Sequence, residues 1–253
     1  MLKQHSDRVV AHFAADFQPQ VSFLRKLPEV AESLVGSLKW KDWFINPNRI
    51  LLVERDKGMV FSMDHRRLTW QVLGLNQWRS ELTEFVTSTL EALRIFEVSD
   101  LKRIGFKVQA FLPLELSQSE LMKLCFDSFY VSADDLADII GNPYDCVVNL
   151  FGNKNNQKFA LQLLPMKATE ASETFRGSVG HLDKLIDNLF VDNIVRAFHS
   201  RISQADCFCF DMDVFQEEQR PSDILGFASD ALHLADESCN ACVARVKSLP
   251  RTS

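Results

Sequence analysis

The sequence contains no apolar run that approaches the roughly 20 residues needed to cross a bilayer. Its N-terminus, MLKQHSDRVV, lacks the uninterrupted hydrophobic stretch of a secretory signal peptide. Six cysteines spread over 253 residues do not form the dense pattern of a disulfide framework. We therefore expect a cytoplasmic protein without a membrane-spanning segment, whose cysteines are reduced and buried.

Motifs that identify common enzyme classes are also missing. The sequence has neither a P-loop nor a G-x-G-x-x-G, which removes the usual support for nucleotide binding. None of its six histidines belongs to an HExxH. The segment Gly177-Ser178-Val179-Gly180 is not a G-x-S-x-G nucleophile elbow, because its serine directly follows the first glycine. No convergent set of catalytic residues is therefore recognisable.

What is present is an ordinary globular composition, with 46% hydrophobic and 25% charged residues, which excludes a disordered or low-complexity chain. The net charge of −6 is unevenly distributed. Residues 1–112 carry 16 Lys and Arg against 13 Asp and Glu, whereas the remainder carries 12 against 21. A nucleic-acid binder needs a concentrated basic surface, so nucleic acid is not the expected partner.

The N-terminal half alternates between strand and helix patterns. Apolar residues at every second position predict a strand from Val9 to Phe17, and Pro28 fits the first turn of the helix that follows. Gly58 supplies the positive φ of a tight turn between two later strands. Apolar residues at helical spacing predict a long helix over 75–96. Strands between the two helices are predicted at 49–54, 59–63 and 68–73.

The C-terminal half begins with a strand over 103–112 and continues with a helix that the capping box of Ser117 and Glu120 opens. The segment 167–180 is small, polar and contains glycine, so it is predicted to be a mobile loop. The other elements predicted in this half are a short helix from the capping box of Ser132 and Asp135, a hairpin over 146–151 and 158–164, a helix over 181–201, a strand over 206–215 and a helix over 222–247.

The two halves share one order of elements. In each half a strand and a helix precede three strands and a long amphipathic helix, with 167–203 inserted in the second half. Each helix has one apolar stripe to bury and each strand one apolar face. We therefore predict an α+β fold with an antiparallel sheet covered on one face by long helices. It would consist of two pseudo-repeated halves, 1–100 and 101–253, in one compact unit.

The strongest candidate for a metal site is the segment that carries Asp211 and Asp213. Side chains two apart on a strand lie on one face, roughly 6–7 Å from each other, so two carboxylates can share a divalent cation. Arg103 and Lys107, on another predicted strand, could neutralise the charge of a substrate phosphate. The alternative interpretation is a structural strand whose aspartates face water or a basic partner.

Cys239 and Cys242 form a C-x-x-C, but both belong to the apolar stripe of the predicted helix 222–247. We therefore expect them in the core. Cys207 and Cys209, on the preceding strand, would complete a four-thiolate metal site only if their strand face packed on this helix.

His233 lies on the same predicted helix as the C-x-x-C, but on the opposite side from Cys242. One helix therefore cannot bring both side chains to one metal ion. Together with Arg103 and Lys107, His233 remains a candidate ligand-binding residue.

Trp40 and Trp43 follow the first predicted helix. They could form a partly exposed aromatic surface for a partner. The edge of the core is the favoured location for the pair.

Three segments of the chain resemble a sporadically distributed family of uncharacterised bacterial proteins of about this length: Arg103–Val108, Phe210–Val214 and the closing helix with Leu232 and His233. Members of the family share an R-x-G-[LF]-[RK] strand near the middle and an acidic D-x-D strand before the last helix. The chain departs from the family pattern at 109–111, where Gln-Ala-Phe replaces a more polar stretch with Asn and Arg. The resemblance implies a bacterial cytoplasmic protein and carries no particular activity.

Our leading hypothesis is a binding or protein-interaction module without catalytic activity or cofactor. It would bind a protein or a small molecule in a groove between sheet and helices, or form a homodimer through exposed sheet edges. The alternative hypothesis is a Mg²⁺-dependent enzyme that acts on a phosphate-containing substrate, with Asp211 and Asp213 as metal ligands. A third, weaker hypothesis is a nucleic-acid accessory protein that docks through its positive N-terminal half.

Overall fold

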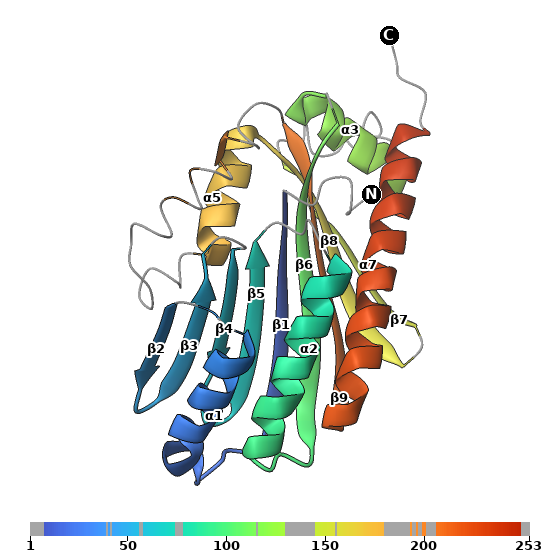
Figure 1. The fold of residues 1–253 in the computed structure, drawn as a ribbon. Helices are drawn as coiled ribbons and strands as arrows, with labels where there is room; N and C mark the ends of the chain where they lie inside the picture. The colour runs from blue at the N-terminus through green and yellow to red at the C-terminus, as the bar shows by residue number, and fades with distance from the viewer. Residues whose placement is uncertain are drawn as a thin grey trace.

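The computed structural model describes residues 8–38, 40, 42–55, 58–73, 78–114, 116–129, 145–154, 156–179, 193, 196, 199–200 and 206–248. These residues form an α+β fold whose nine strands make one antiparallel sheet in the order β2-β3-β4-β5-β1-β6-β9-β8-β7 (Figure 1). Strands β1 and β6 pair at the middle of the sheet and join the two halves of the chain. The prediction of an α+β fold with an antiparallel sheet is confirmed.

The strands are β1 (Val9–Phe17), β2 (Asp42–Asn46), β3 (Arg49–Glu54), β4 (Met59–Met63), β5 (Arg67–Leu73), β6 (Leu101–Pro113), β7 (Val148–Lys154), β8 (Gln157–Met166) and β9 (Cys207–Gln219). The helices are α1 (Phe23–Leu38), α2 (Trp78–Ile95), α3 (Gln118–Phe129), α5 (Ala168–Val179), the 3-10 helix η3 (Pro221–Asp223) and α7 (Ile224–Lys247). None of the described helices is long and apolar enough to cross a membrane.

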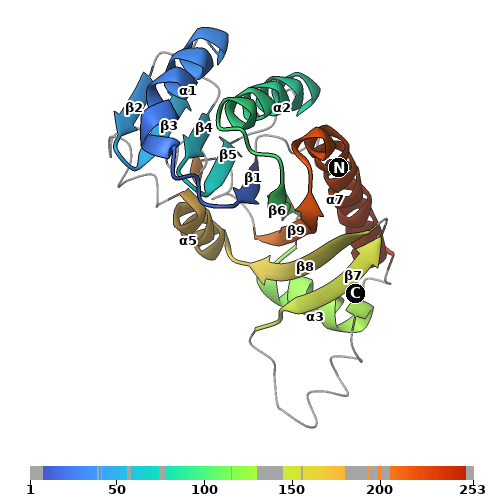
Figure 2. The ribbon, with the colours of Figure 1, turned by 90° about the horizontal axis from the view of Figure 1, so that it is seen from below.

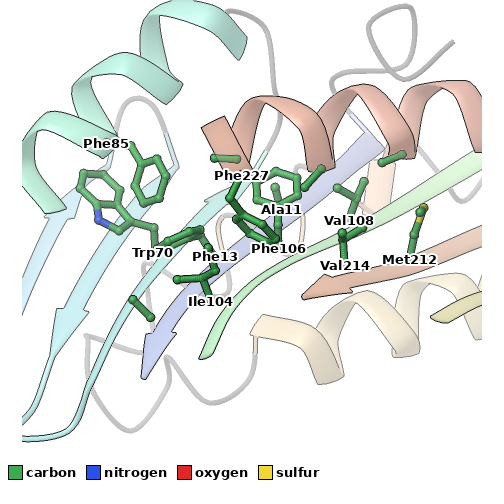
Figure 3. Packing of buried hydrophobic residues seen from close by; sticks show 14 of the residues in the cluster. Ala11, Phe13, Trp70, Phe85, Ile104, Phe106, Val108, Met212, Val214 and Phe227 are labelled. Atoms are coloured by element: carbon green, nitrogen blue, oxygen red, sulfur yellow. The ribbon is translucent and has the colours of Figure 1, made fainter. Parts of the chain in front are cut away.

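The alternation of side chains along the strands gives the sheet two different faces. We call the face that carries Phe13 and Phe106, which lie opposite each other on β1 and β6, the helix face. The other face carries the neighbouring pair His12 and Lys107, and we call it the open face. On the helix face, the Phe85 ring of α2 lies 4.6 Å from the Phe13 ring between centroids, in an edge-on contact (Figure 3). Buried apolar residues on this face form the main core.

Helices lie on both faces of the sheet. α1, α2 and α7 lie side by side across the helix face, whereas α5 lies across the open face (Figures 1 and 2). A second, smaller core lies under α5 and contains Phe111, Ala171 and Phe175. Helices were predicted on one face of the sheet only, but α5 and its core also occupy the other face.

The segment 168–179 is a helix, so the prediction of a mobile loop over 167–180 is wrong there. Ala171 and Phe175, four residues apart, point to one side of α5 and are buried in the second core. The first turn is also capped, because the backbone amide of Ala168 donates to Asp206 Oδ1 at 3.3 Å. The burial of Ala171 and Phe175 and the cap by Asp206, which lies far away in the sequence, stabilise a helix that the local composition does not indicate.

The strand β2 was not predicted, and it separates the two tryptophans that were considered as a pair. Trp40 is buried in the main core, with its ring centroid 5.3 Å from that of Trp70. Trp43 lies on β2 at the edge of the sheet and is exposed. Trp40 therefore belongs to the core, and only Trp43 is available at the surface.

Most other predicted elements lie within a few residues of the observed ones, as for β3, β4 and α2. The hairpin of β7 and β8 is tighter than predicted, because Lys154 already pairs with Gln157. The helix expected from Ser132 lies outside the described residues, as does nearly all of the helix expected over 181–201.

Candidate functional site

Five polar side chains of β6 and β9 meet in the middle of the open face, and we call them the central polar cluster: Arg103, Lys107, Gln109, Asp211 and Asp213. The register places Lys107 opposite Asp213 and Gln109 opposite Asp211. Lys107 Nζ lies 2.9 Å from Asp211 Oδ2, which also accepts a hydrogen bond of 2.7 Å from Gln109. Arg103 Nη2 donates to Asp213 Oδ2 at 3.3 Å. The structure thus brings together four of the five residues that were predicted as site candidates.

The period of two along β9 positions the two carboxylates. Phe210, Met212 and Val214 are buried in the main core on the helix face. The residues between them, Asp211 and Asp213, must therefore point to the open face. The prediction that both aspartates share one face of a strand is confirmed.

Each carboxylate of the cluster is already compensated by a cation of β6. Burial raises the pKa of Asp213 above its ordinary value, although the charges of Arg103 and Lys107 lower it; the charge of Asp211 raises it further. The arrangement is a layer of paired charges, in which burial makes Asp213 take up a proton at a higher pH than an ordinary aspartate does.

The raised pKa of Asp213 predicts a specific dependence of stability on pH. Between the ordinary Asp pKa, about 3.9, and the raised value, the folded chain binds more protons than the unfolded chain, so the free energy of unfolding falls as the pH rises. The variant Asp213→Asn lacks this effect. The difference in unfolding free energy, variant minus wild type, should therefore increase as the pH rises from about 4 through the raised pKa of Asp213, as measured by urea denaturation.

A matched carboxylate on the same strand provides the control for this experiment. The ion pair with Lys158 lowers the pKa of Glu217, so its stabilising contribution is lost as the pH falls through that lowered value. For Glu217→Gln the same difference should decrease with rising pH. Equal slopes for the two variants would contradict the assignment of the raised pKa to Asp213.

Helix α5 is hydrogen-bonded to the central polar cluster. Ser178 Oγ, in the last turn of α5, donates to Gln109 Oε1 at 2.5 Å. Gln109 in turn donates to Asp211. The cluster is therefore covered at one end by α5 and exposed at the other, where Arg103 and Asp213 are partly accessible.

His233 does not join the other predicted site residues. It lies on α7, which covers the opposite face of the sheet (Figure 1). Its side chain is exposed to solvent. His233 Nε2 lies 3.2 Å from Glu237 Oε1, one turn further along the helix. The structure therefore does not bring His233 together with Arg103 and Lys107, because the sheet lies between them.

The four cysteines considered for a metal site are divided between the two cores. Cys239 and Cys242 lie in the main core on the helix face, as expected from the stripe of their helix. Cys207 and Cys209 lie in the second core under α5. The sheet separates the two pairs, so they cannot form a four-thiolate site. Burial raises the pKa of Cys207 and Cys239 to about 12, and the described residues contain no group of three or more potential metal ligands.

A polar concavity lies beside the central polar cluster, over strands β1, β3, β4 and β5. Its volume is about 280 Å³, and we call it the β1–β5 concavity. The polar residues that line it are His12, Arg49, Ser62, Asp64, Arg67, Thr69 and Gln71. Sequence reasoning missed this feature, because its residues come from four strands whose order is set by long-range pairing.

Gln71 is an unusual residue in this concavity. The residue is only 4% exposed, and neither its amide nitrogen nor its amide oxygen has a hydrogen-bond partner among the described residues. A buried polar group without a partner costs on the order of 1–3 kcal/mol. The Gln71 side chain thus places a buried amide, with unsatisfied donor and acceptor atoms, at the wall of the concavity.

Both edge strands of the sheet expose large apolar side chains. On β2, three consecutive residues are accessible, with Trp43 51%, Phe44 44% and Ile45 41% exposed. On β7 at the other edge, Phe151 is 80% exposed and Leu150 is also accessible. Natural edge strands usually carry charges, proline or bulges that prevent pairing with other chains. The continuous apolar run on β2 is therefore a candidate interaction surface.

No model of a known protein family matches the sequence, and no curated protein matches it.

Proposed function

We propose that the protein is a non-catalytic interaction module that forms a homodimer through its β2 edge. The observation that carries the proposal is the exposure of three consecutive large apolar residues on an edge strand, Trp43, Phe44 and Ile45. Within the described part of the chain, no strand pairs with the outer side of β2. Unpaired backbone amides and carbonyls at such an edge are a template for another strand.

The β2 strand is complementary to a second copy of itself. In an antiparallel pair centred on Phe44, the ring of Phe44 lies beside its symmetry mate, and Trp43 lies opposite Ile45 of the other copy. Aromatic and β-branched side chains are favourable cross-strand neighbours. Asp42 lies opposite Asn46, so the pair brings no like charges together. A two-fold dimer of this kind would continue the sheet across both copies.

The dimer is tested by one charged substitution on β2. Phe44→Lys introduces the residue that commonly protects natural sheet edges. Because the substitution enters the interface twice, we expect the dissociation constant of the dimer to rise by about 100-fold. Sedimentation velocity over a range of concentrations measures this change. The far-ultraviolet circular dichroism of the variant should match that of the wild type, since the Phe44 side chain is exposed.

The matched control is Phe151→Lys, which places the same charge on the edge strand β7. This variant should dimerise like the wild type. A wild-type protein that is monomeric at every concentration would overturn the proposal. Loss of association only in Phe151→Lys would move the interface to β7, and loss in both variants would indicate β2-to-β7 pairing, which also contradicts a two-fold β2 dimer.

The alternative function, a Mg²⁺-dependent enzyme with Asp211 and Asp213 as ligands, is supported less well. Lys107 and Gln109 already contact one carboxylate oxygen of Asp211, and Arg103 contacts Asp213. A metal ion at this position would have to displace these partners. The paired charges instead favour a structural role for the cluster on an otherwise uncovered part of the sheet.

We also propose that the two halves of the chain, 1–100 and 101–253, arose by internal duplication. The sheet order supports this, because from its centre outwards the strands are β1, β5, β4, β3 on one side and β6, β9, β8, β7 on the other. In each half a helix follows the first strand and a long helix follows the last. β2 has no counterpart among the described strands, and α5 is inserted between β8 and β9.

We further propose a cytoplasmic location. It is supported by the six cysteines, none of which forms a disulfide.

A further inference from the structure

The β1–β5 concavity has a floor of small residues. Ser62 on β4 pairs with Thr69 on β5, and Thr69 pairs with Ala14 on β1. Ala14 in turn lies opposite Gly105 on β6. A row of short side chains therefore crosses four neighbouring strands of the open face, which leaves space above the sheet.

Longer polar side chains form the walls on both sides of this row. On one side, Gln71 lies opposite His12, which lies opposite Lys107. On the other side, Arg67 lies opposite Asp16 and donates to Asp16 Oδ2 at 2.8 Å. The concavity is thus a trough between two polar rows, and its position depends on the register of the central strands.

The charged groups of the trough differ in how far they are already satisfied. Arg67 is bound to Asp16 through two nitrogens. Asp64 accepts hydrogen bonds from the backbone amides of Arg66 and Arg67 at 2.9 and 3.0 Å. The side chain of Arg49, by contrast, has no hydrogen bond or ion pair with any described residue, although it lines the concavity. Its guanidinium can therefore take a new anionic partner.

Two independent features thus point to a ligand in the same trough. A guanidinium offers parallel N–H donors in a fork that matches carboxylate or phosphate oxygens. The buried amide of Gln71 offers one acceptor and two donors, and neither its nitrogen nor its oxygen is satisfied by the described residues. A volume of about 280 Å³ suits a molecule at or below the size of common small ligands.

We propose that the β1–β5 concavity binds a small organic anion that also carries an amide or an equivalent donor–acceptor group. Arg49 pairs with the carboxylate or phosphate of the ligand, and Gln71 exchanges hydrogen bonds with its amide. The site is distinct from the β2 edge, so this inference goes beyond the proposed dimer and does not depend on it.

The test is a nuclear magnetic resonance titration of ¹⁵N-labelled protein with four small probes. N-acetylglycine has a carboxylate and an amide, and acetamidomethylphosphonate replaces the carboxylate by a phosphonate. Acetate lacks the amide, and N-methylacetamide lacks the anion. We expect one or both of the first two probes to shift the resonances of the Gln71 side-chain amide and of Arg49 Nε–H. The stronger of the two identifies the preferred anion, and the two incomplete probes should bind at least tenfold more weakly.

Two variants separate a ligand site from a structural one. Arg49→Gln should raise the dissociation constant of the preferred probe by tenfold or more, whereas Arg245→Gln, at the end of α7, should leave it unchanged. Gln71→Leu should abolish binding and raise the melting temperature of the ligand-free protein by roughly 2–4 °C, because it removes the unpaired amide.

Several results would overturn this proposal. One is the absence of any shift at Gln71 and Arg49 with all four probes up to their solubility limits. Another is a lower melting temperature for Gln71→Leu, which would show that the amide is satisfied within the protein itself, for example by a fixed water. The titration is repeated on the Phe44→Lys variant, so a failure of the dimer and a failure of this site are seen separately.

Discussion

Replacing Trp70 by alanine should lower the free energy of unfolding by about 3–5 kcal/mol. Trp70 lies on β5 and is only 2% exposed. Its ring centroid lies 4.9 Å from that of Phe85, 5.2 Å from that of Phe61 and 5.3 Å from that of Trp40. The substitution would thus leave a cavity between β5, β4 and α2. Figure 3 shows Trp70 beside Phe85 of α2. Urea denaturation followed by circular dichroism measures the loss.

The variant Trp70→Phe distinguishes lost packing from lost hydrogen bonding. Trp70 Nε1 is buried without a hydrogen-bond partner among the described residues. Phenylalanine keeps one aromatic ring and removes this unpaired donor, so we expect a loss of only ~1–2 kcal/mol. A loss for Trp70→Ala below that of Trp70→Phe would show that the aromatic cluster does not stabilise the fold.

Phe175→Ala should detach α5 from the open face and lower the free energy of unfolding by about 3 kcal/mol. Phe175 is 1% exposed and contacts Phe111 edge-on, with 6.4 Å between ring centroids. Its removal takes away the largest buried side chain that α5 contributes to the second core. Hydrogen exchange measured by mass spectrometry should show protected amides in 168–179 of the wild type and fast exchange there in the variant.

The control for this substitution is Phe151→Ala, which removes the same side chain from an exposed position on β7. Its effect on stability should stay within about 0.5 kcal/mol. Fast exchange of 168–179 in the wild-type protein would contradict the helix itself. Unchanged exchange in Phe175→Ala would show that the cap by Asp206 and the bond from Ser178 suffice to hold α5 in place.

The elements that the sequence predicts correctly are those whose own residues carry the pattern. β1 and β9 alternate between apolar and polar residues because one face of each is buried in the main core. α2 and α7 have stripes at helical spacing because each covers that core from one side. The same local logic correctly placed Asp211 and Asp213 on one face of a strand.

The elements that the sequence does not predict depend on partners far away in the chain. α5 is a polar segment that forms a helix because Phe175 packs against Phe111 and because Asp206 caps its first turn. β2 is too short for a period to show, and its partner β3 supplies the pairing that defines it. The candidate sites follow the same rule, because no local signal shows that Arg103 meets Asp213 or that Arg49 and Gln71 share one trough.

The central position of β1 and β6 also determines the order in which the sheet can form on the ribosome. Partners within the N-terminal half are close in sequence, since Val10 pairs with Leu73. The partner of Leu101 at the start of β6, by contrast, is Gln219. Contacts of such separation form slowly, and domains fold from the N-terminus as they emerge. We therefore expect the first half to fold early, so that β6 can pair with the free edge of β1 as soon as it is synthesised. The other edge of β6 would stay unpaired until β9 has been synthesised.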